Sequence, residues 1–96
     1  MKILPFRQMR PALILVRAQV ALLMGIKGTP YTDQDYALFF VMNDAAAHLD
    51  NPTRKQMIIT LVAWFRLFKR LIEALPEDNP ARASFLEVYE TNSAPY

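Results

Sequence analysis

Residues 51–75 constrain the fold of this chain more than any other feature. This 25-residue run, NPTRKQMIITLVAWFRLFKRLIEAL, opens with Asn51-Pro52 and is followed directly by Pro76. Asparagine is a good helix N-cap and proline suits the first helical position, whereas a later proline cannot continue a helix. Between these limits the apolar residues recur with the helical period and show no β-type alternation. We therefore predict one long α-helix over residues 52–75.

Three further helices are predicted from similar signals, over residues 11–25, 33–49 and 80–91. Pro11 suits the first position of a helix, and either of the two glycines, Gly25 or Gly28, can end that helix in the left-handed conformation. A start nearer Pro5, with a kink at Pro11, is the alternative.

The second helix has the clearest start in the chain. Thr32 is a good N-cap, and Asp35 occupies the reciprocal position of a capping box three residues later. Tyr31 and Tyr36 flank this start where a hydrophobic staple would sit. The fourth helix begins with a second Asn-Pro pair, at residues 79–80.

Together these elements predict an all-α fold, a compact bundle of four helices in one domain. The domain would span residues 1–91, with a short N-terminal extension before the first helix and a disordered tail over residues 92–96. A chain of 96 residues can bury most of a modest core without a metal or a disulfide. It contains no cysteine, which excludes disulfides, thiolate zinc sites and cysteine nucleophiles.

The same features predict a cytoplasmic protein with no membrane span. Prolines and charged residues interrupt the N-terminal residues, which therefore do not resemble a signal peptide. The longest apolar stretch, residues 11–26, is too short to cross a bilayer and contains Arg17 and Gln19. The absence of cysteine fits a reducing compartment.

On a helical wheel the predicted 52–75 helix divides into an apolar half and a basic arc. The apolar half contains Met57, Ile58, Leu61, Trp64, Phe65, Leu67, Phe68, Leu71, Ile72 and Leu75. The opposite arc contains Lys55, Arg66, Lys69, Arg70 and Glu73, with Ile59 and Val62 among them. The apolar half is wider than a surface helix needs, so we expect this helix to form both core and binding surface.

The predicted 11–25 helix is apolar on nearly every side, since its polar residues are limited to Arg17 and Gln19. A four-helix domain of this size cannot easily surround two such helices. The surplus apolar surface predicts a homodimer or an obligate protein partner. The alternative is a monomer in which the apolar residues of segment 3–6 fold back as a lid.

The predicted 33–49 helix has one apolar face, with Tyr36, Phe40 and Val41 pointing elsewhere. The face is formed by Leu38, Met42, Ala45, Ala46 and Leu49. Its alanines would let another helix approach closely, and we interpret it as a packing surface.

Charge changes sign from one segment to the next, although the net charge is only +2. Residues 1–32 carry no acid, residues 33–50 carry no Lys or Arg, residues 51–75 are basic and the remainder is acidic. One interpretation is that neighbouring helices neutralise one another. The other is that the basic segments share a face that attracts nucleic acid or an acidic partner.

Nucleic-acid binding is therefore the alternative function. The row Arg66, Lys69 and Arg70 and the pair Arg54-Lys55 would contact phosphates, and a second basic patch, Arg7, Arg10 and Arg17, would add to them. However, the basic arc has almost no Asn, Gln, Ser or Thr to read base edges. Such binding would be directed mainly at the phosphate backbone of the nucleic acid.

No residue pattern predicts catalysis or a cofactor. Asp44 and His48 lie one helical turn apart, and with Asp50 they offer at most three metal ligands and no second imidazole. Neither Ser84 nor Ser93 lies in a nucleophile motif, and no phosphate-binding glycine loop is present. We interpret Asp44 and His48 as a surface pair and predict no enzyme, no cofactor and no metal site.

The sequence thus predicts a small non-enzymatic protein–protein interaction module, an adaptor, inhibitor or assembly factor that acts through helix faces as a homodimer. Aromatic anchors would be desolvated at the centre of the interface and basic residues would form its rim. The predicted partner-binding residues are Arg54, Lys55, Ile59, Val62, Arg66, Lys69 and Arg70.

Overall fold

A computed structural model describes residues 5–96 of the chain and confirms the all-α prediction for them. Four α-helices account for the regular structure of this part: α1 (Phe6–Met24), α2 (Asp33–Ala47), α3 (Arg54–Ala74) and α4 (Pro80–Ser93). No strand occurs among the described residues. The four predicted helices are therefore present, with ends that differ by a few residues.

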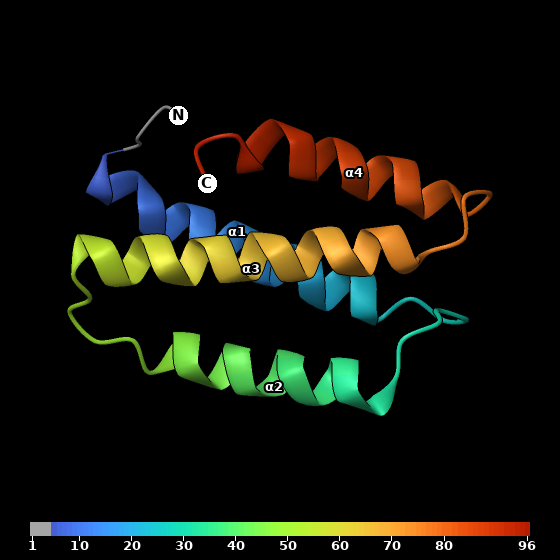
Figure 1. The fold of residues 1–96 in the computed structure, drawn as a ribbon, viewed down its shortest axis with the longest axis horizontal. Coiled ribbons are helices and arrows are strands. Elements are labelled where there is room, and N and C mark those ends of the chain that lie inside the picture. The colour runs from blue at the N-terminus through green and yellow to red at the C-terminus, as the bar shows by residue number, and fades with distance from the viewer. Residues whose placement is uncertain (1–4) are drawn as a thin grey trace.

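The bundle is flattened into a slab whose Cα atoms extend over 39 × 27 × 16 Å. The central helices α1 and α3 run in the same direction and pack against each other, with α3 in front of α1 in Figure 1. The other two helices run the opposite way along the two edges of this pair, α4 along one and α2 along the other (Figure 1). One broad face of the slab is thus formed by the outer side of α3, and the other by the outer side of α1.

The core lies between α1 and α3 and uses the wheel positions predicted for the long helix. All of the predicted apolar half is buried except Ile58, which is partly buried. From α1 the core receives Met9, Leu13, Val16, Val20, Leu23 and Met24. Aromatic rings of α4 complete it, since Phe85 and Tyr89 meet the Phe68 ring at centroid distances of 6.1 Å and 6.2 Å.

The first helix begins five residues earlier than the predicted start at Pro11. Pro5 is the N-cap and Pro11 lies inside α1, so the alternative start near Pro5 describes the structure better. An interior proline costs about 3 kcal/mol, whereas burying a methionine returns about 1.5–3 kcal/mol. Met9 is completely buried in the extra turn, which offsets much of this cost. Of the predicted lid, Phe6 belongs to α1 and is 45% exposed, and residues 3 and 4 lie outside the described part.

The prediction that Asn51 and Pro52 start the long helix is wrong. Thr53 is the N-cap of α3: its Oγ1 accepts the Gln56 N–H at 3.1 Å, and Gln56 Oε1 accepts the Thr53 N–H at 2.8 Å. This capping box satisfies two otherwise unpaired N–H groups, which an asparagine cap alone would not do. Asn51 instead turns the preceding loop with a φ of 43°.

The other helix ends match the predictions more closely. Thr32 and Asp35 form the predicted capping box of α2, and Asn79 caps α4 through a bond from the Ala81 N–H to its Oδ1 at 3.0 Å. Of the two glycines after α1, Gly28 has the left-handed conformation, with a φ of 80°. The other, Gly25, remains right-handed.

The C-terminal residues pack against the bundle, in contrast to the disordered tail predicted for residues 92–96. Helix α4 continues to Ser93, two residues beyond its predicted end. The Tyr96 ring stacks on Phe65 with centroids 5.6 Å apart and an angle of 11° between the planes. The apolar contact of this last side chain accounts for the difference. No described helix has both the length and the apolar character needed to cross a membrane.

Candidate functional site

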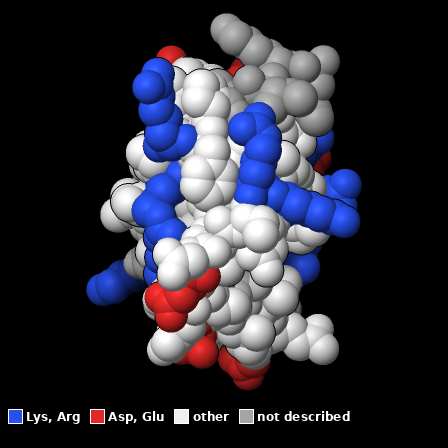
Figure 2. Space-filling view, turned by 90° about the vertical axis from the view of Figure 1, so that its left-hand side faces the viewer, with Lys and Arg blue, Asp and Glu red and all other residues white. Residues whose placement is uncertain are grey.

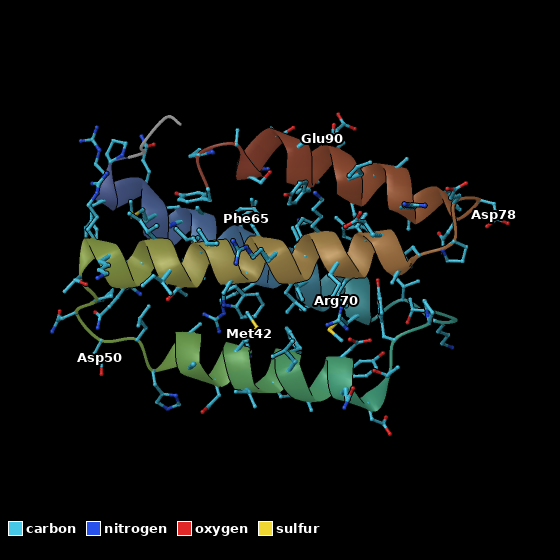
Figure 3. All side chains as sticks on the ribbon, viewed as in Figure 1. Met42, Asp50, Phe65, Arg70, Asp78 and Glu90 are labelled. Carbon is cyan, nitrogen blue, oxygen red and sulfur yellow. The ribbon has the colours of Figure 1, made fainter. Side chains whose placement is uncertain are left out.

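Helix α2 contributes few buried side chains, and several polar contacts fix it to the central helices. Only Asp35 and Ala46 of α2 are buried, although the helix contains 15 residues. Figure 3 shows Met42 of α2 and Arg70 of α3 in the space between these two helices. The contacts that fix α2 therefore determine the shape of the surface beside it.

The N-terminal end of α2 is tied to α3 by an ion pair between Asp35 and Arg70. The Asp35 side chain is 8% exposed, whereas that of Arg70 is 60% exposed. The second carboxylate oxygen of Asp35 accepts the Thr32 N–H at 3.0 Å as part of the capping box. One carboxylate thus both starts α2 and anchors it to α3.

Two tyrosines secure the same end. The Tyr31 hydroxyl donates to the Leu71 carbonyl of α3 at 2.6 Å, and the Tyr36 hydroxyl donates to the Met24 carbonyl of α1 at 3.0 Å. Burial, followed by the nearby Asp35 carboxylate, raises the pKa of Tyr31 to about 12. The hydroxyl therefore stays protonated, as its role as a donor requires.

The middle of α2 contacts both central helices. Arg17 of α1 donates from Nε and Nη2 to the Asn43 Oδ1 at 3.0 Å and 2.9 Å. The Phe39 ring meets the buried Trp64 ring edge-on, with centroids 6.0 Å apart. Arg17, one of the few polar residues of α1, is thus a fixed contact to α2.

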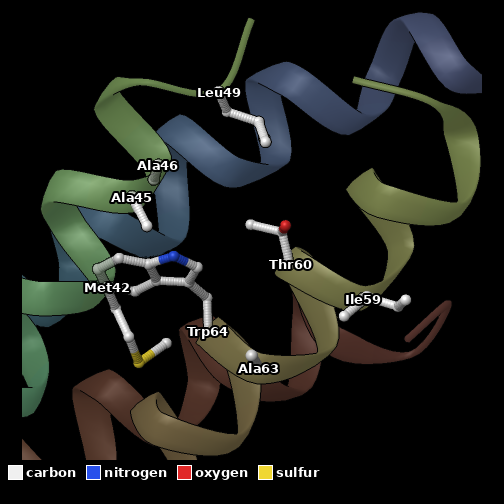
Figure 4. A pocket seen from close by; sticks show the side chains of 8 residues that line it. All are labelled: Met42, Ala45, Ala46, Leu49, Ile59, Thr60, Ala63 and Trp64. Carbon is white, nitrogen blue, oxygen red and sulfur yellow. The ribbon is translucent and has the colours of Figure 1, made fainter. Parts of the chain in front are cut away.

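A groove runs between α2 and α3. One part of it, of about 230 Å³, is lined by Met42, Ala45, Ala46, Leu49, Ile59, Thr60, Ala63 and Trp64 (Figure 4). The adjoining part is lined by Leu38, Met42, Ala63, Arg66, Leu67 and Arg70. Met42 and Ala63 line both parts, so the two parts form one continuous groove. We call it the α2/α3 groove. Alanine side chains on both walls leave this space unfilled.

The seven predicted partner-binding residues do not form one surface. Lys55, Ile59, Val62 and Arg66 lie on the outer side of α3, where Ile59 is 59% exposed and also lines the groove. Arg70 pairs with Asp35 as described above. Lys69 lies over the Tyr89 ring of α4, with Nζ 5.9 Å from the centroid. Arg54 lies on the α4 side of the bundle, close enough to the Tyr96 hydroxyl to influence its pKa.

Exposed apolar side chains of α2 form a surface that was not among the predicted partner-binding residues, all of which lie on α3. Phe40 is 64% exposed and Val41 67% exposed, and Leu38 is 41% exposed at the groove. Leu38 and Met42 belong to the predicted packing face: Met42 does pack against the core, and both residues also line the groove. The many apolar residues around α2 were the sequence signal that could have predicted this exposed surface.

Basic side chains also gather at the end of the slab where α1 and α3 begin. Figure 2 shows this end, with basic side chains over its upper part and acidic side chains below. The first turns of α1 and α3 contain no acidic residue. Arg7 lies in the first turn of α1 with Arg10 just after it, and Arg54 and Lys55 begin α3. Like charges at two neighbouring helix N-termini oppose both helix dipoles, which makes this end attractive to anions.

Asp44 and His48 form a surface pair one turn apart at the C-terminal end of α2, where His48 is the C-cap. The Nδ1 atom of His48 lies 3.4 Å from Asp44 Oδ1 and 2.9 Å from the Asp44 backbone oxygen. Both side chains are more than three-quarters exposed, so neither lies in an enclosed site. In the described part of the chain, His, Cys, Asp and Glu form no group of three or more that could hold a metal.

Comparisons with models of known protein families, with curated proteins and with solved structures found no match for this chain.

Proposed function

We propose that this protein is a small non-enzymatic interaction module that binds other protein chains through its helix faces and forms a homodimer in the cytoplasm. The α2/α3 groove and its exposed apolar rim carry the proposal. Single exposed apolar residues are normal on a protein surface, but Leu38 and Ile59 are both exposed and line the same groove. Burying a side chain of this size contributes about 1.5–3 kcal/mol.

The opposite broad face adds to the support for a protein partner. On α1, Ile14 and Leu22 are each 61% exposed. Ala18 and Ala21 are exposed between them. This arc of α1 is the surplus apolar surface from which the sequence predicted an oligomer. An interaction module with two apolar faces can form a dimer through one face and bind a further protein through the other.

Sedimentation and affinity capture together test this function. We expect the purified protein to sediment as a dimer at micromolar concentration, or to be captured from native lysate in a stoichiometric complex that survives nuclease treatment. A monomer at all concentrations that captures no protein would contradict the proposal. Replacing Ile59 by Glu should weaken the complex if α3 contributes to it, because a carboxylate cannot be buried there without a partner.

A nucleic-acid-binding regulator is the second candidate, supported by the basic end of the slab. The basic face of α3 supports it less than the sequence suggested, because Arg70 contacts Asp35 and Lys69 contacts Tyr89. Binding through Arg7, Arg10 and Lys55 would be directed at phosphates and would weaken steeply with salt. Failure to bind duplex DNA or RNA at low salt would contradict this candidate, whereas loss of binding in a variant with Glu at these three positions would support it.

A further inference from the structure

The α2/α3 groove has a length that suits a short helix. The ends of its lining lie 11 positions apart on each wall, at Leu38 and Leu49 on α2 and at Ile59 and Arg70 on α3. At 1.5 Å per residue this is about 16 Å, or about three helical turns. The part of about 230 Å³ is too small to enclose a helix, which is about 10 Å wide with its side chains. A bound helix would therefore rest on both walls and insert one row of side chains.

The walls of the groove allow an apolar surface to approach closely. Ala45 of α2 and Ala63 of α3 are exposed in the lining, and their short side chains let another backbone come near both walls. Leu38 and Ile59 are exposed beside them. The lining residues recur at helical spacing on each wall, so a row of apolar side chains with the same spacing can interdigitate with them. This geometry fits the apolar side of an amphipathic helix.

The charged side chains that line the groove are both basic. They are Arg66 and Arg70, and none of the described lining residues is acidic. Arg70 pairs with Asp35, whereas Arg66 is exposed and has no ion pair with a described residue. Glu73 lies three positions beyond the end of the lining. A chain bound in the groove would therefore meet the charge of Arg66 without a competing carboxylate from the lining.

The outer side of α3 continues this pattern along the wall. Lys55 and Arg66 lie on either side of Ile59 and Val62, so a basic residue stands at each end of an apolar centre. Like Arg66, Lys55 is exposed and has no ion pair with a described residue. An apolar centre with charged residues at its rim is the usual arrangement of a protein–protein interface. Attraction to this rim requires carboxylates on the flank of the occupant that faces α3.

We propose that the α2/α3 groove binds a short amphipathic helix of another protein, with apolar side chains in the groove and Asp or Glu on the flank beside α3. This inference rests on the proposed interaction function and names the partner of one of its faces. A nucleic-acid backbone has no apolar side and would leave Leu38 and Ile59 in water. A second copy applied through the same groove would add the same basic lining and no lining carboxylate.

Selection from a library of displayed helical peptides tests the chemistry of the occupant. The probes carry a fixed row of leucines along one side and random residues on both flanks. We expect the wild-type protein to enrich peptides with Asp or Glu on one flank. The Arg66→Glu protein should instead enrich peptides with Lys or Arg at those positions, because the reversed charge selects the opposite sign.

Two pairs of variants test the position of the binding site, with a fluorescently labelled peptide from the selection. Ala63→Leu fills the groove and should weaken binding by about tenfold or more, whereas Ala47→Leu, outside the lining, should leave it unchanged. Arg66→Glu should also weaken binding by about tenfold, and Lys27→Glu, which makes the same charge change after α1, by less than about twofold. All four positions are exposed, and circular dichroism should show that each variant keeps its helix content.

Several results would overturn the inference. Enrichment of no peptide would do so, as would enrichment of basic or uncharged flanks by the wild type. Equal effects of Ala63→Leu and Ala47→Leu would place binding elsewhere. A homodimer that dissociates in Ala63→Leu would assign the groove to a second copy. If the inference fails but the protein still associates through Ile14 and Leu22 of α1, the proposed interaction function stands; a monomer that captures no protein contradicts that function itself.

Discussion

Asp35 pairs with Arg70 across the space between α2 and α3 while it caps the start of its own helix. A buried carboxylate is stable in its charged form only when its hydrogen bonds are satisfied. Here the backbone N–H of Thr32 donates to one carboxylate oxygen of Asp35, and the guanidinium of Arg70 donates to the other. The start of α2 is thereby linked to its position in the bundle.

Replacing Arg70 by Met should therefore destabilise the protein more than loss of an ordinary surface ion pair. Surface pairs contribute about 0–1 kcal/mol, whereas removal of one partner leaves the buried Asp35 carboxylate without its cation. Because Arg70 itself is largely exposed, we expect an intermediate loss of about 1–3 kcal/mol in urea unfolding. Arg66→Met is the control and should change stability by less than about 0.5 kcal/mol. Equal losses in the two variants would contradict the structural role of the pair.

Tyr31→Phe should change how stability depends on alkaline pH. Because the folded pKa of about 12 lies above the unfolded value of 10.0, the Tyr31 contribution is fully present below pH 10 and is lost as pH rises toward 12. At neutral pH the variant loses the bond to the Leu71 carbonyl, at a cost of about 1 kcal/mol. We expect the difference from the wild type to shrink between pH 10 and pH 12, measured by urea unfolding. A constant difference over this range would show that the hydroxyl is not the group responsible.

The start of α3 can be tested with two neighbouring substitutions. Thr53→Ala removes the cap and half of the capping box, and should cost about 1 kcal/mol. Asn51→Gly should be neutral or slightly stabilising, because glycine adopts the φ of 43° without strain. Thermal unfolding of both variants gives the comparison. The opposite ranking would place the cap at Asn51, as the sequence first suggested.

The last side chain of the chain should contribute measurably to stability. Tyr96→Ala removes the ring stacked on Phe65, and such an aromatic pair contributes about 0.5–1.5 kcal/mol beyond its buried area. Tyr96→Phe retains the stack and removes only the hydroxyl, which is buried without a hydrogen-bond partner in the described part, so it should not destabilise. If neither variant changes the melting temperature, residues 92–96 are the disordered tail that the sequence predicted.

A double-mutant cycle on Arg17 and Asn43 would measure how strongly α2 is held in the middle. Each of Arg17→Ala and Asn43→Ala removes the bonds between α1 and α2, so their effects should not add. We expect a coupling energy of about 1 kcal/mol from urea unfolding. Additive effects would mean that this contact makes no net contribution to the position of α2.

The helical pattern alone predicted the helices and the core of this protein, but not the surface that α2 forms. The buried half of α3 followed from the sequence because a helix repeats its direction every few residues, so spacing determines which side chains share a face. The cap at Thr32 was also predictable, since both of its hydrogen bonds join residues three positions apart. The cap at Thr53 had the same local signal, which the stronger Asn-Pro pattern obscured.

Only the tertiary structure brought Asp35 to Arg70, Arg17 to Asn43 and Ile59 to Met42. These pairs are separated by 35, 26 and 17 positions in the sequence, so no local pattern encodes them. The predicted basic surface was consequently divided: Arg70 contacts α2, Lys69 contacts α4, and Lys55 and Arg66 remain on the outer side of α3. The sequence by itself determined that residues 51–75 form a helix with an apolar and a basic side, because those properties depend on neighbours within one turn. How the basic side is used, and where a groove opens beside it, was decided by the packing of the other helices.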